Sequence, residues 1–208
     1  MPNVDQEATG PVAVLGAGDQ AIMVASVLID AGYAIGGFYT DDRAAIGNRI
    51  LGIEVKGTIA DADPCLTPNG IIAIGSNEAR KKLAKSVPLN WITAVHPSVV
   101  VLPEVEIGKG TVIFPGSVVE VGARIGEHVI LNTMSSAAHH CSIGDYVHLV
   151  KANVSSHCVV EEGVFMGIQS TLTPGISVGA WATIGAGSVV LHDVAPNETV
   201  VGTPARPI

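Results

Sequence analysis

Charged and aromatic residues are scarce in this chain of 208 residues, which holds 11 Lys and Arg, 19 Asp and Glu, two Trp, three Tyr and three Phe. The formal charge of -8 and the lack of basic clusters exclude a nucleic-acid partner, because binding to phosphate backbones depends on clustered Lys and Arg. Apolar runs all fall short of the roughly 18–20 residues of a membrane helix, so no membrane partner is expected. Aliphatic residues and 24 glycines are abundant instead, a profile typical of tightly wound, repetitive β structure.

Cysteine is equally sparse. Cys65, Cys141 and Cys158 form an odd and scattered set that suits neither a disulfide framework nor paired metal ligands. We therefore expect reduced thiols and a cytoplasmic protein. Residues 1–10 carry two acidic side chains and lack the apolar core of a signal peptide, so they are predicted to form a loose leader.

Strand and helix patterns alternate over residues 11–91. Apolar runs at 12–15, 35–39 and 71–75 are separated by helical periodicity, and Ser76 is placed to cap the helix after the third run. Buried apolar strands between helices indicate a parallel sheet with helices on its faces. The sequence therefore predicts a small α/β domain of Rossmann-like type at 11–91.

A six-residue repeat replaces helical periodicity from about Ile92 onward. Its inward positions are filled mostly by large aliphatic residues, at Ile107, Ile113, Val119, Ile125, Leu131, Ala137, Ile143 and Leu149. Ile-Gly recurs every 18 residues, as expected if three hexads form one coil. Each hexad then gives a short strand and a turn, and stacked coils bury one side chain per strand in a triangular prism. We predict an all-β, left-handed parallel β-helix at 92–208.

The repeat slips once. After Leu149 the next inward residue is Val154, only five residues on, so one residue is missing near 151–153. In a strict solenoid such a slip deforms a corner and can mark a functional site. A deletion simply absorbed by a loop explains the pattern equally well.

Histidines gather in the middle of the predicted β-helix. His139 and His140 fall on a turn outside the prism, His148 follows half a coil later, and His157 lies roughly one coil beyond His140. Such β-helices commonly form three-fold assemblies, in which turns of neighbouring helices meet in clefts. Histidine in general titrates near neutral pH, so one in a cleft can act as a general base. The alternative is that these turn residues merely face solvent.

The turn after the first apolar run has the form G-x-G-x-x-G/A. Such a turn lets phosphate approach backbone N–H groups at the positive end of a helix, which makes Gly18, Asp19 and Gln20 candidate nucleotide contacts. Asp41 and Asp42, after the second run, are placed to contact a ribose or base. The structural alternative is a tight turn that needs glycine for steric reasons. The α/β domain is too short for a full dinucleotide site.

Several motifs carry a resemblance that covers nearly the whole chain. They lie at residues 16–18, 72–78 with Arg80, 94–98, 130–133, 139–141 with His148, 165–167, 184–190 and 202–205. With these motifs the chain resembles the sialic acid O-acetyltransferase family of hexapeptide-repeat enzymes. It is particularly similar to the bacillosamine and perosamine N-acetyltransferases of that family, which act on nucleotide-linked amino sugars.

The resemblance implies an enzyme of polysaccharide biosynthesis that transfers an acetyl group from acetyl-CoA to a sugar amine. It implies a homotrimer with active sites between neighbouring β-helices, no tightly bound cofactor, and His139 as the general base with His140 beside it. Contacts to acetyl-CoA are implied for His148, Ile168 and Ala186.

The same resemblance assigns the α/β domain to the nucleotide-linked sugar. Gly18, Asp19 and Gln20 match the turn that meets this substrate. Three further positions match its remaining contacts, at Asp41, Asp42 and Gly75.

Three positions depart from the family pattern. The family usually places Glu or Asp after the catalytic histidine, where an anion raises its basicity, but here the neighbour is His140. The first turn commonly carries Gly-His, whereas this chain has Asp19 and Gln20. The slip falls near the expected thioester and introduces Lys151 in place of small residues.

Other functions stay open at this point. An attacking amine loses its proton late and tolerates a weak base, which favours N-acylation over O-acetylation of sialic acid or another sugar. A non-catalytic sugar-nucleotide-binding protein is a second alternative. The γ-class carbonic anhydrases bind zinc on a similar scaffold through a histidine pair five residues apart, and this sequence has no such pair, so no metal site is predicted.

Overall fold

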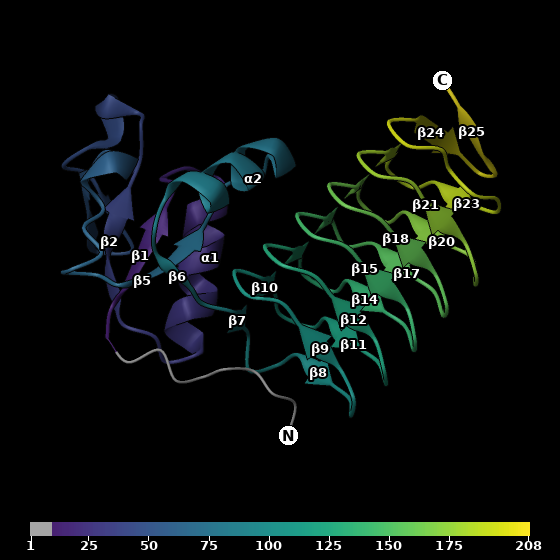
Figure 1. The fold of residues 1–208 in the computed structure, drawn as a ribbon, viewed down its shortest axis with the longest axis horizontal. Helices are drawn as coiled ribbons and strands as arrows, with labels where there is room; N and C mark the ends of the chain where they lie inside the picture. The colour runs from purple at the N-terminus through teal and green to yellow at the C-terminus, as the bar shows by residue number, and fades with distance from the viewer. Residues whose placement is uncertain (1–9) are drawn as a thin grey trace.

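The computed structural model describes residues 10–208, in which a small α/β layer lies against a long β-solenoid (Figure 1). The predicted leader at 1–10 falls almost wholly outside the described residues. Among the described residues, neither α-helix has the length and hydrophobicity needed to cross a membrane.

The α/β layer is built on one six-stranded sheet with the strand order β3-β4-β2-β1-β5-β6. Its strands are β1 (Val12–Leu15), β2 (Ile35–Tyr39), β3 (Arg49–Ile50), β4 (Ile53–Gly57), β5 (Asn69–Ile72) and β6 (Asn90–Trp91). Its helices are α1 (Asp19–Asp30), α2 (Asn77–Ser86) and the short 3₁₀ turns η1 (Arg43–Ala45) and η2 (Ile59–Asp61). All pairs are parallel except β3 with β4, so the predicted parallel sheet is confirmed.

The solenoid has three faces, each a sheet built from every third strand. Face I comprises β7 (Ala94–Val95), β10 (Val112–Ile113), β13 (Ile130–Leu131), β16 (His148–Leu149), β19 (Phe165–Met166), β22 (Thr183–Ile184), β24 (Thr199–Gly202) and the antiparallel β25 (Ala205–Pro207). Face II comprises β8 (Val100–Val101), β11 (Val118–Val119), β14 (Ser136–Ala137), β17 (Asn153–Val154), β20 (Thr171–Leu172) and β23 (Val189–Val190). Face III comprises β9 (Glu106–Ile107), β12 (Arg124–Ile125), β15 (Ser142–Ile143), β18 (Val159–Val160) and β21 (Ser177–Val178). The turns that join the faces are corners I/II, II/III and III/I.

The inward column of the solenoid follows the predicted six-residue repeat. The second residue of most strands points into the prism and is buried, as at Ile113, Leu131 and Leu149. Stacked coils of parallel strands confirm a β-solenoid of the left-handed β-helix type.

All three cysteines are free thiols, and burial raises the pKa of Cys141 to about 12, which keeps this thiol protonated and inert.

The predicted slip lies at corner I/II, between β16 and β17. Three residues (150–152) form this turn, whereas four (132–135) form the turn one coil below it. Strand partners are 18 residues apart below the slip and 17 apart across it. Ala152 still fills the inward position and Lys151 adopts a left-handed backbone with φ 49°, so the prism continues without a break.

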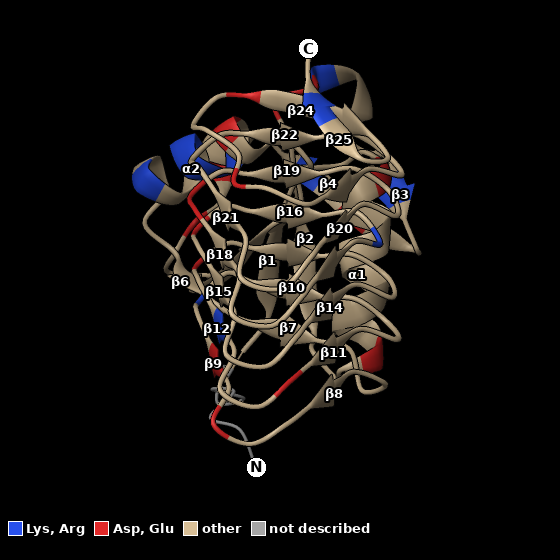
Figure 2. Cartoon of the chain, turned by 90° about the vertical axis from the view of Figure 1, so that its right-hand side faces the viewer, with Lys and Arg blue, Asp and Glu red and all other residues tan. Residues whose placement is uncertain are grey.

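A shared apolar core fixes the α/β layer on the solenoid. Helix α1 lies between one face of the sheet and face I, and its buried stripe packs in one cluster with Val112 and Ile130 of face I and with Phe114, which follows β10. The opposite face of the sheet packs against Leu83 of α2 and Ile59 of η2. Lys and Arg gather on α2, while most of the solenoid carries little charge (Figure 2). Apolar packing of α1 against face I therefore helps to hold the α/β layer on the solenoid.

Candidate active site

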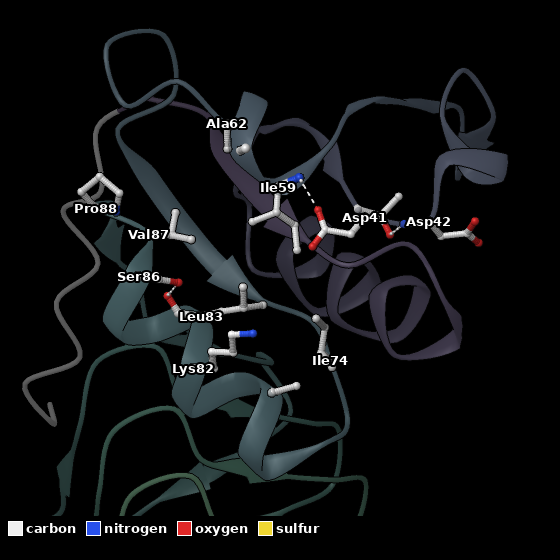
Figure 3. Close-up of a pocket in the computed structure, with 13 residues that line it drawn as sticks. Asp41, Asp42, Ile59, Ala62, Ile74, Lys82, Leu83, Ser86, Val87 and Pro88 are labelled. Atoms are coloured by element: carbon white, nitrogen blue, oxygen red, sulfur yellow. Dashed lines mark hydrogen bonds between the residues drawn. The ribbon is translucent and has the colours of Figure 1, made fainter.

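A cleft of about 690 Å³ opens where β2 ends, between η2 and α2 (Figure 3). Asp41 faces this cleft, and its Oδ1 accepts a hydrogen bond from the Ile59 N–H at 3.3 Å. Asp42 also lines the cleft, but its Oδ1 caps η1 by accepting from the Ala44 N–H at 3.0 Å. Lys82 lines the opposite wall from α2. The cleft is thus lined by two carboxylates, of which Asp42 caps η1, and by one basic side chain on the facing wall.

The glycine turn after β1 lies at the same sheet edge, because β1 and β5 are adjacent parallel strands. Gly18 and Asp19 are exposed, and Gly18 caps α1 with φ -90°. Gln20 is half-buried, and its Nε2 is buried without a hydrogen-bond partner in the described chain. Gly75, at the end of the β5 segment, would meet nothing within 4 Å if it carried a Cβ. These four candidate residues lie beside the cleft at the sheet edge rather than on its walls.

Gly16 is the position where this turn requires glycine. Its φ is +128°, and an added Cβ would lie 2.6 Å from the Ala73 carbonyl oxygen, whereas a Cβ on Gly18 would touch nothing within 4 Å. We expect Gly16→Ala to lower the free energy of unfolding by about 1–3 kcal/mol, and Gly18→Ala by less than about 1 kcal/mol. Urea titration of both variants measures the difference. Equal losses would contradict a steric role for Gly16.

Three imidazoles share corner II/III. The ring centroids of His139, His140 and His157 lie 5.3–5.5 Å apart, with His140 and His157 stacked at 28°. All three side chains are exposed. The backbone N–H of His139 donates to Glu120 Oε2 at 2.9 Å, so a carboxylate from the preceding coil stands at this corner. Within the described residues, no set of three His, Cys, Asp or Glu side chains is arranged to hold a metal ion.

His148 does not belong to this cluster. Of the histidines singled out in the sequence, His157 joins His139 and His140 at this corner. His148 lies half a coil further on, as its spacing predicted, and half a coil carries the chain from corner II/III to face I. His148 is buried there, its Nδ1 lies 3.2 Å from the Gly75 carbonyl oxygen, and its ring meets Phe165 edge-on. Burial first, and then the charge of Arg80, lowers the pKa of His148 to about 4.

The remaining candidate residues lie on corner I/II. Ile168 and Ala186 are exposed there, one coil apart, and Lys151 lies one coil below Ile168. Face II separates this corner from His139. A single chain therefore does not bring the predicted acetyl-CoA contacts and the predicted general base together.

Two buried polar residues escaped the sequence reasoning as site residues. Arg80 and Asn77 of α2 point toward corner III/I of the solenoid and donate hydrogen bonds to carbonyl oxygens of its turns. The polar neighbours of Arg80 on α2 give no indication that it is buried. The only feature of the sequence that could have identified it is its place in the motif at 72–78 with Arg80.

Stacked coils of six-residue repeats place this chain in the hexapeptide-repeat class of proteins, and the α/β layer with its open cleft is added to that scaffold. The family model of the PglD N-terminal domain matches residues 11–87. GDP-perosamine N-acetyltransferase of Escherichia coli O157:H7 is 33% identical over 178 residues, covering 81% of this chain and 80% of that protein.

Solved structures agree over the whole chain. PerB from Caulobacter crescentus, in complex with CoA and GDP-perosamine, is 30% identical with a TM-score of 0.90, covering 97% of this chain and 98% of that one. The acetyltransferase domain of PglB from Neisseria gonorrhoeae FA1090, in complex with acetyl coenzyme A, is 28% identical with a TM-score of 0.87, covering 96% and 100%. This chain belongs to the hexapeptide-repeat sugar acyltransferase family.

Proposed function

We propose that this protein transfers the acetyl group of acetyl-CoA to the amine of a nucleotide-linked amino sugar. The observation that carries the proposal is the similarity over 97% of the chain to PerB, whose structure holds CoA and GDP-perosamine together. In this proposal residues 11–91 bind the nucleotide-linked sugar and residues 92–208 bind acetyl-CoA, which acts as a co-substrate. The reaction takes place in the cytoplasm and supplies sugars for polysaccharide biosynthesis.

The cleft at the end of β2 is the proposed nucleotide site. Asp41 accepts hydrogen bonds from ribose or base, and Lys82 offsets the charge of the diphosphate. The exposed turn at Gly18, together with Gln20 and Gly75, guides the sugar out of the cleft along the same sheet edge. The unpartnered Nε2 of Gln20 supports this route, since a buried donor without a partner is costly until a ligand satisfies it.

His139 is the proposed general base. As the sugar amine attacks the thioester carbon, His139 takes a proton from the nitrogen, and the tetrahedral intermediate collapses with release of the CoA thiolate. The thiolate then takes this proton from the protonated His139, which leaves an amide, free CoA and a neutral imidazole. The exposed position of His139 on a corner supports this role, because a base at a cleft must reach a substrate held by another surface.

The separation of corners I/II and II/III supports a homotrimer. In a three-fold assembly with face II toward the axis, corner I/II of one copy meets corner II/III of the next, which unites the acetyl-CoA contacts with His139. The outward side chains of face II carry no charge, at Val100, Val118, Ser136, Asn153, Thr171 and Val189. Face III, by contrast, exposes the ion pair of Arg124 and Glu106. An uncharged face is the one suited to packing against further copies.

A charge placed on face II tests this assembly. We expect Thr171→Arg to give monomers in analytical ultracentrifugation and to lower kcat at least about tenfold, because three unpaired cations would be buried around the axis. Ser177→Arg on face III, in the same coil, is the matched control and should stay trimeric and active. A trimeric, active Thr171→Arg protein would refute the use of face II.

The function itself is tested by release of CoA thiol from acetyl-CoA with a panel of UDP-, dTDP- and GDP-linked amino sugars. Turnover with one acceptor, and an N-acetylated product by mass spectrometry, is the expected result. Binding of a nucleotide-linked sugar without thiol release from any acyl donor would instead indicate a non-catalytic binding protein.

A further inference from the structure

Arg80 is a fully buried cation, with 1% of its surface exposed. Its guanidinium takes part in no ion pair among the described residues. Every hydrogen bond that it donates goes to a neutral oxygen: Ile74 O (3.2 Å), Gly75 O (2.9 Å), Asn77 Oδ1 (2.9 Å), His128 O (3.1 Å), Tyr146 O (2.7 Å) and Val147 O (3.3 Å). The side chain therefore joins the end of β5 to two successive turns of corner III/I.

A buried charge of this kind is poorly explained by stability alone. Burial disfavours the charged form and lowers the pKa of Arg80 to about 9, and apolar side chains of similar volume often replace buried charges without loss of stability. What an apolar side chain cannot do is fix several carbonyl groups at once in set directions. The role of Arg80 therefore lies in the carbonyl groups that it orients.

One of these carbonyls is shared with His148. The Gly75 oxygen accepts from Arg80 Nη1 at 2.9 Å and lies 3.2 Å from His148 Nδ1. Because a carbonyl oxygen only accepts, His148 Nδ1 must carry the hydrogen, and the Nε2 of the neutral ring is left as an acceptor. That Nε2 is buried and has no partner in the described chain. Gly75 is a candidate sugar contact and His148 a candidate acetyl-CoA contact, so one carbonyl connects the two sites.

We infer that Arg80 is a positioning residue, which acts through the Gly75 carbonyl to hold His148 as the Nδ1–H tautomer with Nε2 ready to accept a hydrogen bond from an N–H donor of a substrate. This inference rests on the proposed function for the identity of the substrates. The donor is an amide N–H of the pantetheine arm or the amine of the sugar. Because the Gly75 carbonyl links the two candidate contacts, binding of the sugar at Gly75 affects His148, and binding of acetyl-CoA at His148 affects Gly75.

The tautomer is measured directly by ¹⁵N-imidazole NMR of the full chain, with His148→Asn used to assign the signal. We expect wild-type His148 to show a protonated Nδ1 and an unprotonated Nε2, and Arg80→Met to show a mixture of tautomers with kcat lower by about 10²-fold. Addition of CoA alone, or of a nucleotide-linked sugar alone, should shift the Nε2 signal and so identify the donor. A wild-type Nε2–H tautomer, or an Arg80→Met protein with unchanged tautomer and kcat, would overturn the inference.

A matched pair of variants decides the matter even if Arg80→Met does not fold. His148→Asn keeps a donor near the Nδ1 position, whereas His148→Gln keeps a polar group near Nε2 and loses the bond to Gly75. We expect His148→Asn to keep the wild-type melting temperature while kcat falls, and His148→Gln to melt earlier. The opposite order would refute the link through Gly75. The NMR and melting experiments need no turnover, so they separate a failure of this inference from a failure of the proposed reaction.

Discussion

Replacement of His139 by alanine should lower kcat by about 10²–10⁴-fold, the usual contribution of a general base. The imidazole stands exposed at corner II/III, beside His140 and His157, whose rings lie 5.5 and 5.3 Å away, and beside Glu120, whose carboxylate accepts from the His139 backbone N–H at 2.9 Å. The KM for acetyl-CoA should change little, because its predicted contacts lie on corner I/II. Steady-state thiol release over a range of both substrates measures the effect.

His192→Ala is the control for this experiment. His192 is also exposed and also follows a face II strand, but it lies three coils further along the solenoid. Its loss should leave kcat within about twofold of the wild type, and melting curves should show that both variants remain folded. Equal activity in the two variants would remove His139 from the mechanism and would direct attention to His140 and His157.

Acidification should destabilise the fold between about pH 6.5 and pH 4. His128 and His148 are buried, and desolvation, reinforced by the charge of Arg80, lowers the pKa of each to about 4. In this interval the unfolded chain binds protons that the folded chain cannot, so the free energy of unfolding falls as the pH falls. Each histidine contributes at most about 3 kcal/mol to this loss, which is complete below pH 4.

Urea titrations at several pH values measure this loss, and His128→Phe supplies the control. The Phe ring can keep the stack on Tyr146 and the edge contact with Trp91, while the titrating group is removed. Lys109 also lowers the pKa of His128, and Asp145 raises it, so the comparison is made at constant ionic strength. The slope of the unfolding free energy against pH reports how many more protons the unfolded chain binds than the folded chain. In the variant this number should be lower by about one. A variant with the wild-type slope would show that His128 titrates normally in the folded chain.

The sequence predicted the solenoid well because each coil obeys a local rule. A six-residue period determines which side chains point inward, so the positions of Leu131, Val154 and the shortened turn at 150–152 all follow from counting. Two of the predicted α/β strands were also found as expected, at 12–15 and 35–39. The third ends at Ile72 rather than at residue 75, because the chain leaves the sheet to form the turn held by Arg80.

The site was harder to predict because its residues are held together by hydrogen bonds to main-chain carbonyl groups, which every residue has. Arg80 bonds to main-chain carbonyls of His128 and Tyr146, and such partners leave no mark in a sequence. Counting placed His148 half a coil beyond His139, but it did not reveal that this residue is buried on face I beside the Gly75 carbonyl. Asp41 was found from its place after a strand, but Lys82 on the facing wall was not, since it becomes part of the cleft only once α2 is packed.

Contacts from α2 reach three successive coils, through Arg80 to the turns at His128 and Tyr146 and through Asn77 to Gly163. The proposed nucleotide cleft is therefore held at a fixed height along the solenoid axis, on which successive coils are about 4.8 Å apart. The distance along this axis from the cleft to His139 at corner II/III can change only by whole coils, since part of a coil would break the strand pairing. Acceptors of different length would thus be accommodated in this architecture by insertion or loss of a complete coil. Changes of side chain would adjust the fit by less than the height of one coil.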